Sequence, residues 1–338
     1  QASRMTASNP AAKLRDFFAS KNKSSNNRRG GLIALYHKEL SDHLNSKRFY
    51  IVFGLLLVVS VASLAGAVSS LFEAGEDSEF VFLSLFTTSS SSIYSFATFI
   101  AFLGPLAGII LGFDAVNNER SQGTLNRLAA QPIYRDNIIN AKFLAGATII
   151  FVMVFCLGLI FSGLGLILIG IPPSAEEVLR VLSFLLLSGI YISFWLALSI
   201  IFSVVCRHAA TAALAGISIW LFLSLFMSLV ASGIANAFYP TEGFEGLLNT
   251  VDNYNLNLAL NRISPYYLFS EAASTILNPS VRSIGVVTMS QIEGAVASSL
   301  TLEQSLLLIW PHIVVMIALV MADFAIAYVK FMRQEIRA

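Results

Sequence analysis

The sequence predicts an all-α integral membrane protein with about six transmembrane helices. Of its 338 residues, 56% are hydrophobic and 12% are charged, whereas an ordinary soluble domain carries about 25% charged residues. Several apolar runs reach the roughly 20 residues that a helix needs to cross the hydrocarbon core of a bilayer. The composition therefore argues against a soluble hydrophobic core.

The first 31 residues are rich in Ser, Asn, Lys and Arg and show no apolar periodicity. This composition is typical of a disordered segment, so we expect a basic cytoplasmic tail over residues 1–31. The first long apolar run begins at Phe49 and lacks a small-residue cleavage pattern. It therefore predicts a retained helix rather than a signal peptide.

An amphipathic helix is predicted over residues 32–48, between the tail and the first spanning helix. Leucine and tyrosine recur there at four-residue spacing, which places them on one helix face, and the charged residues lie elsewhere on the helical wheel. We expect the helix to lie along the cytoplasmic interface of the membrane; the alternative is an ordinary solvated helix. The residues that define it are Leu32, Tyr36, Lys38, Glu39, Leu40 and Leu44.

Six apolar segments within residues 49–338 are long enough to span a membrane. The third of them is long enough to include a cytoplasmic turn. Before the last one, the segment at about 237–303 is too long for a simple connection, so we expect it to fold against the outer face of the membrane, with a short helix that follows Pro265 and stops before Pro279. The six predicted spans are 49–72, 93–116, 137–170, 178–204, 212–236 and 304–330.

The distribution of Lys and Arg predicts that both termini are cytoplasmic. Basic residues near helix ends are retained on the cytoplasmic side, and ten of the 21 precede Phe49. With the N-terminus inside, 18 of the 21 fall on the inner side, including Lys142, and only Arg180, Arg262 and Arg282 fall outside. We therefore expect a multi-pass protein of the plasma membrane.

The inner loop over residues 117–136 is the most informative part of the sequence. It alternates charged residues with Leu125, Leu128 and Ile133, and it reaches a Gln-Pro pair that breaks a helix. The pattern predicts a short amphipathic cytoplasmic helix, which a transporter driven by a separate motor needs for docking. A solvated loop is the alternative, and the residue pattern alone leaves both open.

The run ERSQGTL at 119–125, followed by AAQPIYRDNIINAKFLA, resembles the signature region of ABC transporter type-2 permeases. The stretches YHKELSDHLNSKRF, SPYYLFSEAASTILNP and YVKFMRQEIRA are similar to other parts of the same family, in particular to the subgroup that includes the permease of the nitrous-oxide-reductase maturation transporter. The resemblance implies the transmembrane permease subunit of an exporter. It also implies a second permease copy and a separate cytoplasmic ATPase that holds ATP and Mg.

Under this resemblance, the inner loop is the element that couples the permease to the ATPase. We expect apolar residues to enter a groove on the ATPase and charged residues to set the register, with the helix at 32–48 bracing the same contact. The chain has no GxxxxGK[ST] phosphate loop, so we expect neither ATP hydrolysis nor a cofactor in the chain itself. The expected partners are the ATPase, a second permease copy and the lipid bilayer, not nucleic acid. The coupling residues are Glu119, Arg120, Gly123, Thr124, Leu125, Arg127 and Leu128.

Three glycines and two carboxylates in the apolar segments are candidates for a transport pathway or for packing. Gly104, Gly108 and Gly112 are spaced by four, so they line one helix face and allow close approach of another helix. Asp114 and Asp323 are acids inside apolar helices, where a carboxylate is costly. For these acids, a substrate or proton role and a local hydrogen-bonding role are the alternatives.

No metal site is predicted. His37 and His43 are six residues apart and do not share a helix face, and Cys156 and Cys206 have no paired spacing.

Two other function classes remain open alongside the permease. A self-contained secondary transporter or channel would carry internal repeats and charged sites at the membrane midplane. An intramembrane hydrolase would need a serine nucleophile that faces a histidine base, for which Ser218 and His312 are the nominees.

Overall fold

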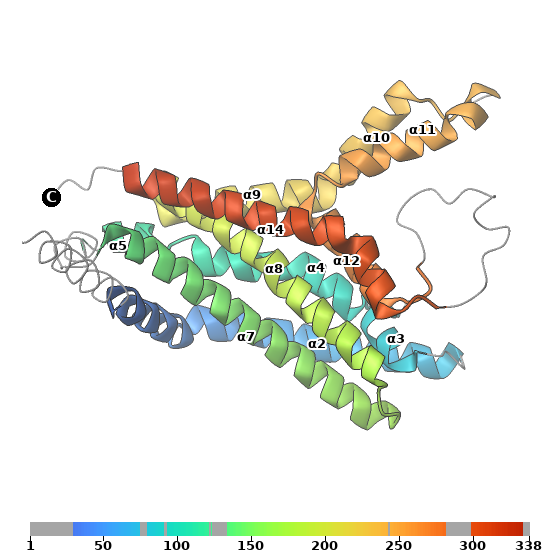
Figure 1. Ribbon diagram of the computed structural model, residues 1–338, viewed down its shortest axis with the longest axis horizontal. Helices are drawn as coiled ribbons and strands as arrows, with labels where there is room; N and C mark the ends of the chain where they lie inside the picture. The colour runs from blue at the N-terminus through green and yellow to red at the C-terminus, as the bar shows by residue number, and fades with distance from the viewer. Residues whose placement is uncertain are drawn as a thin grey trace, which may run out of the picture.

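Long helices that run roughly alongside one another make up the structure, as Figure 1 shows. The computed structural model describes residues 30–74, 80–90, 93–121, 123, 134–242, 244–281 and 299–333. Within these ranges every regular element is a helix, which confirms the predicted all-α membrane fold. Six helical segments are long and apolar enough to cross a membrane, namely Lys47–Phe72, Phe96–Ser121, Arg135–Ile169, Ala175–Val205, Ala209–Phe238 and Leu302–Arg333.

The spanning helices differ in how continuous they are. Five segments contain one long helix each, and these are α2 (Lys47–Ala74), α4 (Phe96–Gly112), α7 (Arg135–Ile169), α8 (Ala175–Val205) and α14 (Leu302–Arg333). The fifth span is divided into α9 (Ala209–Leu221), the π-helix η1 (Phe222–Phe226) and α10 (Met227–Phe238). One expectation is corrected, because α7 is a single helix of 35 residues without an internal turn.

Shorter helices connect the spans, and these are α3 (Val81–Thr87), α5 (Asn117–Ser121), α11 (Phe244–Asn261) and α12 (Pro265–Leu277). A further helix, which we call the N-terminal helix, covers residues 30–44, and a turn at 45–46 separates it from α2. It ends before the predicted boundary at 48 because Lys47 and Arg48 begin α2. Residues 1–29 of the predicted tail and 124–133 of the predicted coupling helix lie outside the described residues.

Helix α8 occupies the centre of the bundle. Of the six spans, α8 has the most buried apolar window, at 78%, against 56% for the span that contains α4 and 33% or less for the others. A capping box fixes the start of α8, since Ser174 Oγ accepts from the Glu177 N–H at 3.2 Å and the Glu177 carboxylate accepts from the Ser174 N–H at 2.8 Å. Helices α4, α7, α12 and α14 pack around α8.

The predicted glycine face of α4 lies directly against α8. A Cβ atom on Gly108 would come within 2.6 Å of the Ile192 carbonyl oxygen, and one on Gly112 within 2.9 Å of the Leu196 carbonyl oxygen. A Cβ on Gly104 would meet the Ile192 side chain at 2.9 Å. The two backbones are therefore in contact, and the glycine face packs within one subunit.

A proline in α4 strengthens this contact through a hydrogen bond. Pro105 has no N–H, so it leaves the carbonyl oxygen of Ala101 without its helical donor. The hydroxyl of Tyr191 on α8 donates to that oxygen at 2.8 Å, and the Tyr191 side chain is completely buried. Since an unpaired carbonyl is expensive in an apolar environment, Tyr191 makes the proline tolerable and holds α4 against α8.

Two serines of α8 continue the same hydrogen-bonded contact toward α5. Ser199 donates to the Ile109 carbonyl oxygen at 3.0 Å, and Ser203 accepts from the backbone N–H groups of Val116 and Asn117 at 2.9 and 3.2 Å. The orphan N–H groups at the start of α5 are thereby satisfied by α8. The end of α4 and the start of α5 are thus fixed to α8.

At the other end of the bundle, Arg180 of α8 joins three segments. Its side chain is completely buried, and its guanidinium donates to the Ile276 carbonyl at 2.8 Å, to Ser305 Oγ at 3.2 Å and to the Leu300 carbonyl at 2.5 Å. It also forms an ion pair with Glu176 at 2.8 Å. The ends of α12 and α14 are therefore held to α8, and α12 occupies the position predicted for the short helix after Pro265.

Gly108→Ala is expected to destabilise the folded protein, because the new methyl group would meet a backbone oxygen that cannot swing aside. Overpacking of this kind costs about 1–3 kcal/mol. Gly163→Ala is the matched control, since nothing lies within 4 Å of its Cβ position in α7 and alanine stabilises a helix relative to glycine. Thermal unfolding of the purified protein in detergent measures both; an unchanged unfolding temperature for Gly108→Ala would contradict the backbone contact.

Candidate functional site

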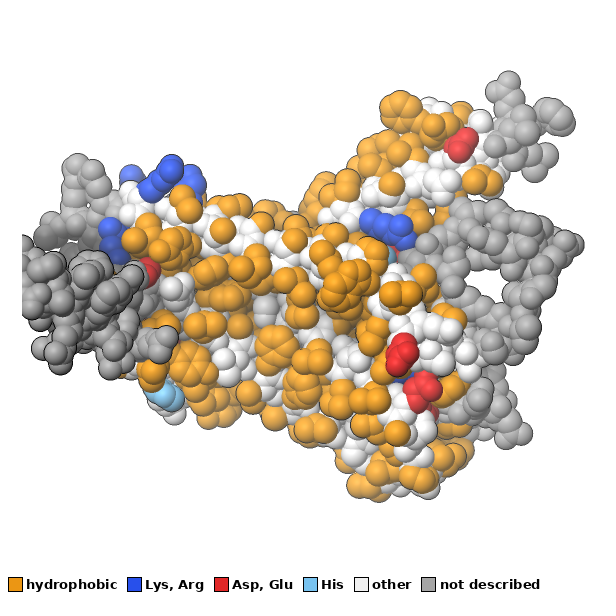
Figure 2. Space-filling model, in the orientation of Figure 1, with side chains coloured by type: hydrophobic (Ala, Val, Ile, Leu, Met, Phe, Trp, Pro, Cys, Tyr) orange, Lys and Arg blue, Asp and Glu red, His pale blue; other side chains and the backbone are white. Residues whose placement is uncertain are grey.

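Charged side chains gather at the two ends of the bundle, while hydrophobic side chains cover its middle (Figure 2). At one end the N-terminal helix, α5 and the first turns of α7 lie side by side (Figure 1). This end carries Glu119, Arg120 and Gly123, the described members of the predicted ATPase-coupling residues. It is therefore the candidate functional site.

Lys142 of α7 is the centre of the site. Its ammonium group donates to Glu39 Oε1 of the N-terminal helix at 3.0 Å and to Glu119 Oε1 of α5 at 2.9 Å. Only 5% of the Lys142 side chain is exposed, so water contributes little to its solvation. One buried cation therefore joins three segments that are far apart in the sequence.

Lys38 completes the charge balance at the surface of the site. Its ammonium group lies 2.9 Å from Glu39 Oε1, 3.4 Å from Glu119 Oε1 and 3.1 Å from Asp42 Oδ2. We call Lys38, Glu39, Glu119 and Lys142 the inner ion-pair cluster. Two ammonium groups and two carboxylates alternate in it, so each buried carboxylate has opposite charge on more than one side.

Electrostatics keep the members of the N-terminal helix ionised. Burial alone would raise the pKa of the Glu39 carboxyl, but the ammonium groups of Lys142 and Lys38 outweigh burial and lower that pKa below its ordinary value. Burial would lower the pKa of Lys38, yet its hydrogen bonds and charge contacts with Glu39 and Asp42 raise that pKa well above its ordinary value. Both groups are therefore charged at neutral pH.

Packing and one further hydrogen bond hold the N-terminal helix on the bundle. The Tyr36 hydroxyl donates to Thr148 Oγ1 of α7 at 3.1 Å. Leu35 is buried, and Leu40 is partly buried against the core. The face with Tyr36 and Leu40 thus contacts the bundle, whereas Leu44 is 40% exposed.

Helix α5 ends in a turn that leads into the loop. The N–H of Gly123 donates to the Arg120 carbonyl at 3.2 Å, and Gly123 has a φ of 67°, a left-handed conformation that glycine adopts without steric cost. A turn therefore closes α5 directly after Glu119 and Arg120. The four other predicted coupling residues, Thr124, Leu125, Arg127 and Leu128, lie outside the described residues.

The two intramembrane acids have different surroundings. The Asp114 carboxylate forms an ion pair with Arg48 of α2, whose guanidinium also lies 5.2 Å from the centre of the Phe113 ring. This partner fits the second of the two roles considered for Asp114, a local hydrogen-bonding role, rather than a substrate or proton role. Asp323 of α14 is half-buried, and its Oδ2 atom has no hydrogen-bond partner among the described residues.

The arrangement of Ser218 and His312 gives no support to a hydrolase site. His312 Nε2 lies 2.7 Å from Glu271 Oε2, Ser218 is exposed on α9, and no hydrogen bond joins the two in the described part of the chain. In the same part of the chain, no group of three or more His, Cys, Asp or Glu residues is placed to bind a metal ion.

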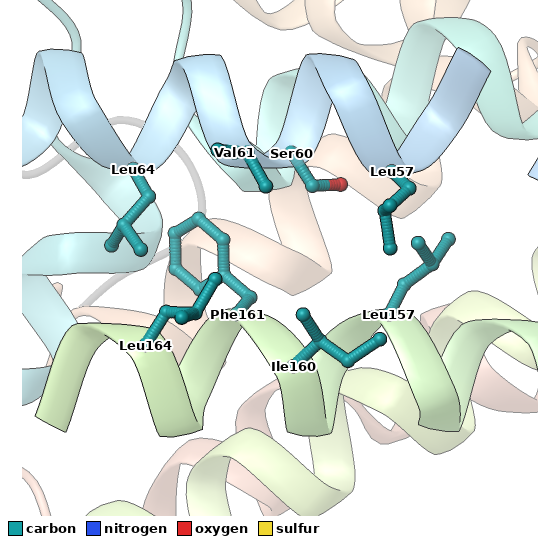
Figure 3. A pocket seen from close by; sticks show the side chains of 8 residues that line it. All are labelled: Leu57, Ser60, Val61, Leu64, Leu157, Ile160, Phe161 and Leu164. Atoms are coloured by element: carbon teal, nitrogen blue, oxygen red, sulfur yellow. The ribbon is translucent and has the colours of Figure 1, made fainter. Parts of the chain in front are cut away.

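A shallow depression between α2 and α7 is a packing seam rather than a binding site (Figure 3). It has no room for a water-sized molecule. The one polar side chain among its described lining residues, Ser60, donates its hydroxyl to the Leu56 carbonyl at 2.6 Å. The depression is lined by Leu57, Ser60, Val61, Leu64, Leu157, Ile160, Phe161 and Leu164.

From the sequence, Lys142 is a basic residue of the inner side with no predicted partner. The signal was present, because Lys142 is followed by a long apolar run within one helix, and a charge in such a position needs a partner of opposite charge. The sequence predicts Glu119 as a coupling residue and Glu39 as a residue of the interfacial helix. Their meeting on one lysine is what the structure adds.

Comparison with known proteins identifies the family. The model of the family described as "ABC-2 family transporter protein" matches residues 33–336. Two relatives are each described as "Probable ABC transporter permease protein NosY". The protein of Stutzerimonas stutzeri is 34% identical over 116 residues, which cover 33% of this chain and 37% of that protein.

The second relative, from Pseudomonas aeruginosa, is 25% identical over 192 residues, which cover 55% of this chain and 64% of that protein. The matched parts thus span less than two thirds of either relative. The family match, in contrast, extends from the N-terminal helix to beyond the described end of α14. The chain therefore belongs to the ABC-2 transporter family.

Proposed function

We propose that this chain is the transmembrane permease subunit of an ATP-binding-cassette exporter, driven by a separate cytoplasmic ATPase. The inner ion-pair cluster carries the proposal, because it fixes the N-terminal helix and α5 as one unit directly before the Gly-Thr-Leu sequence at 123–125. A docking loop transmits force only if its base is rigid. The names of the two NosY relatives support the same function.

In this proposal, the contact between α4 and α8 transmits movement from the loop into the bundle. The loop follows α5, and α5 is fixed to α8 through Ser203. Because α4 touches α8 backbone to backbone at Gly108, displacement of α5 moves both helices together rather than bending one. Helices α4 and α8 then move as one rigid body, and the movement reaches the outer end of α8, where Arg180 lies.

A second permease copy completes the transporter in this proposal. The spans Ala209–Phe238 and Leu302–Arg333 have only 17% and 22% of their apolar windows buried, so broad apolar faces remain for lipid and a second subunit. One subunit also offers one coupling loop and hence one motor contact. The proposed location is the plasma membrane with both termini and the inner ion-pair cluster on the cytoplasmic side, as the distribution of Lys and Arg favours.

Lys142→Met should weaken retention of the ATPase, because it leaves two buried carboxylates with only the half-exposed Lys38 as a shared cation. Removing one member of a buried ion pair costs about 3–5 kcal/mol. Asp42→Asn is the matched control, since Asp42 is 61% exposed and its partner Lys38 is 46% exposed, and exposed pairs contribute about 0–1 kcal/mol. Copurification of the ATPase with tagged permease gives the readout. Equal retention by both variants would count against the proposal.

Docking of the N-terminal helix should also depend on pH through His43. Burial lowers the pKa of His43 below its ordinary 6.5, while Glu39 acts in the opposite direction. Lys142 adds to the lowering, and Asp114 and Asp42 oppose it. An undocked helix therefore binds a proton more readily than a docked one. Docking is fully stable above pH 6.5 and weakens as the pH falls below it.

Amide hydrogen exchange of residues 35–43 measures this effect. The exchange rates are measured one pH unit below and one pH unit above 6.5 and are corrected for the intrinsic rates at each pH. We expect lower protection on the acidic side in the wild type and no such change in His43→Gln. The Glu39 carboxyl stays ionised over this range because its pKa is lowered. A loss of protection of the same size in His43→Gln would assign the effect to another group.

A further inference from the structure

A cavity of about 240 Å³ lies at the opposite end of α4 from the inner ion-pair cluster. It is half open to solvent and is lined by the first turns of α4, by α12 and by the end of α3. At about 30 Å³ per water molecule in the liquid, it has room for about eight waters or one small organic group. Apart from three alanines, every lining residue within the described part of the chain carries a hydroxyl: Thr87, Ser95, Thr98, Tyr266, Ser270 and Ser274.

The hydroxyls fall into two groups. Some of them form hydrogen bonds within the helices that carry them. Ser95 is 3% exposed and caps α4 by accepting from the Thr98 N–H at 3.3 Å. Ser274 donates to the Glu271 carbonyl at 2.9 Å. The hydroxyls of Tyr266 and Ser270, in contrast, form no hydrogen bond within the described residues. They are one helical turn apart on α12, so they present two free donors and acceptors on one wall.

The wall that α12 forms is held from its other side. Arg262 donates to both oxygens of the Glu271 carboxylate at 2.8 and 3.0 Å, and His312 Nε2 lies 2.7 Å from Glu271 Oε2. These contacts lower the pKa of Glu271, against the effect of its burial. Arg180 holds the far end of α12 through the Ile276 carbonyl. The cavity is therefore preorganised, which reduces the entropic cost of binding.

The chemistry of the lining selects the class of ligand. None of the lining residues that the structure describes is charged, so an ion would lose hydration without gaining a counter-charge from them. An apolar group would leave the hydroxyls of Tyr266 and Ser270 without partners. A sugar or polyol satisfies both kinds of surface, because its hydroxyls pair with hydroxyls and its C–H faces contact the Tyr266 ring and the alanine methyl groups.

We propose that this cavity binds a neutral polyhydroxylated group, one sugar or polyol unit in size. A free sugar and the headgroup of a glycolipid share this chemistry. The proposal is argued from the lining of the cavity and does not depend on an ATPase partner. Only the placement of the cavity on the outer side of the membrane rests on the proposed function.

Protection of an engineered cysteine tests the proposal on the full chain in lipid nanodiscs. Ala97→Cys places the reporter in the cavity wall, in a background with Cys156→Ser and Cys206→Ser, and maleimide labelling is followed over time. We expect methyl galactoside to slow labelling about tenfold when its concentration is tenfold above the dissociation constant, since only the unoccupied fraction reacts. Glucose 6-phosphate should have no effect, because the described lining offers its phosphate no cation.

Two controls keep the test specific. Ser280→Cys, exposed just beyond the end of α12 and outside the membrane spans, should label at the same rate with and without sugar. Tyr266→Phe combined with Ser270→Ala removes the two free hydroxyls with little change of volume, and protection of Ala97→Cys should fall sharply. Equal protection in this double variant, or equal protection by glucose 6-phosphate, would overturn the proposal.

Nanodiscs with and without a galactosyl diacylglycerol distinguish the two sources. Protection by free methyl galactoside in plain phosphatidylcholine assigns the cavity to a soluble sugar. Protection only when the glycolipid is present assigns it to a lipid headgroup. Absence of protection in both arms would show that the cavity is a water-filled recess without this affinity.

Discussion

A single ammonium group, that of Lys142, sets the arrangement of the inner end of this protein. It is almost fully buried, and a buried cation is tolerable only with nearby negative charge and satisfied hydrogen bonds. The two carboxylates that supply this charge come from Glu39 and Glu119, which lie on different helices. The N-terminal helix and α5 consequently cannot dock on α7 as independent elements.

From this cluster, an unbroken set of contacts leads through the bundle. Helix α5 is fixed to α8 by Ser203, α4 touches α8 at its glycine face, and Tyr191 repairs the hydrogen bond that Pro105 removes. At the far end, Arg180 holds α12 and α14 to the same helix. Helix α8 thus connects the candidate coupling site to the hydroxyl-lined cavity, and a permease of the proposed kind needs such a connection between its motor and its outer face.

Local features of the fold were predictable from the sequence because they depend on neighbouring residues. The six spans follow from apolar length, and the start of α12 follows from Pro265. The π-helix at Phe222–Phe226 was not predictable, since its apolar run carries no signal that separates it from an α-helix. The third span was expected to be long enough to include a cytoplasmic turn. That turn is absent, because all 35 residues of α7 form one continuous helix.

The candidate site was only half predictable, for a different reason. The sequence identified Glu39, Glu119 and the glycine at 123 through resemblance to a family. The partner of the two acids is 103 and 23 residues away from them, and pairing over such distances is decided by packing rather than by local pattern. Tyr191 belongs to the same class, since its acceptor lies 90 residues away.

A double-mutant cycle with Glu39→Gln and Glu119→Gln tests most directly whether one shared cation unites these segments. The quantity to measure is the free energy of opening of residues 30–44, obtained from hydrogen exchange of the full chain. If both acids act through the ammonium groups that they share, those of Lys142 and Lys38, their effects should deviate from additivity by about 0.5–3 kcal/mol. Glu119→Gln alone should then loosen a helix 80 residues away in the sequence. Additive effects, or no effect of Glu119→Gln on that helix, would contradict the shared site.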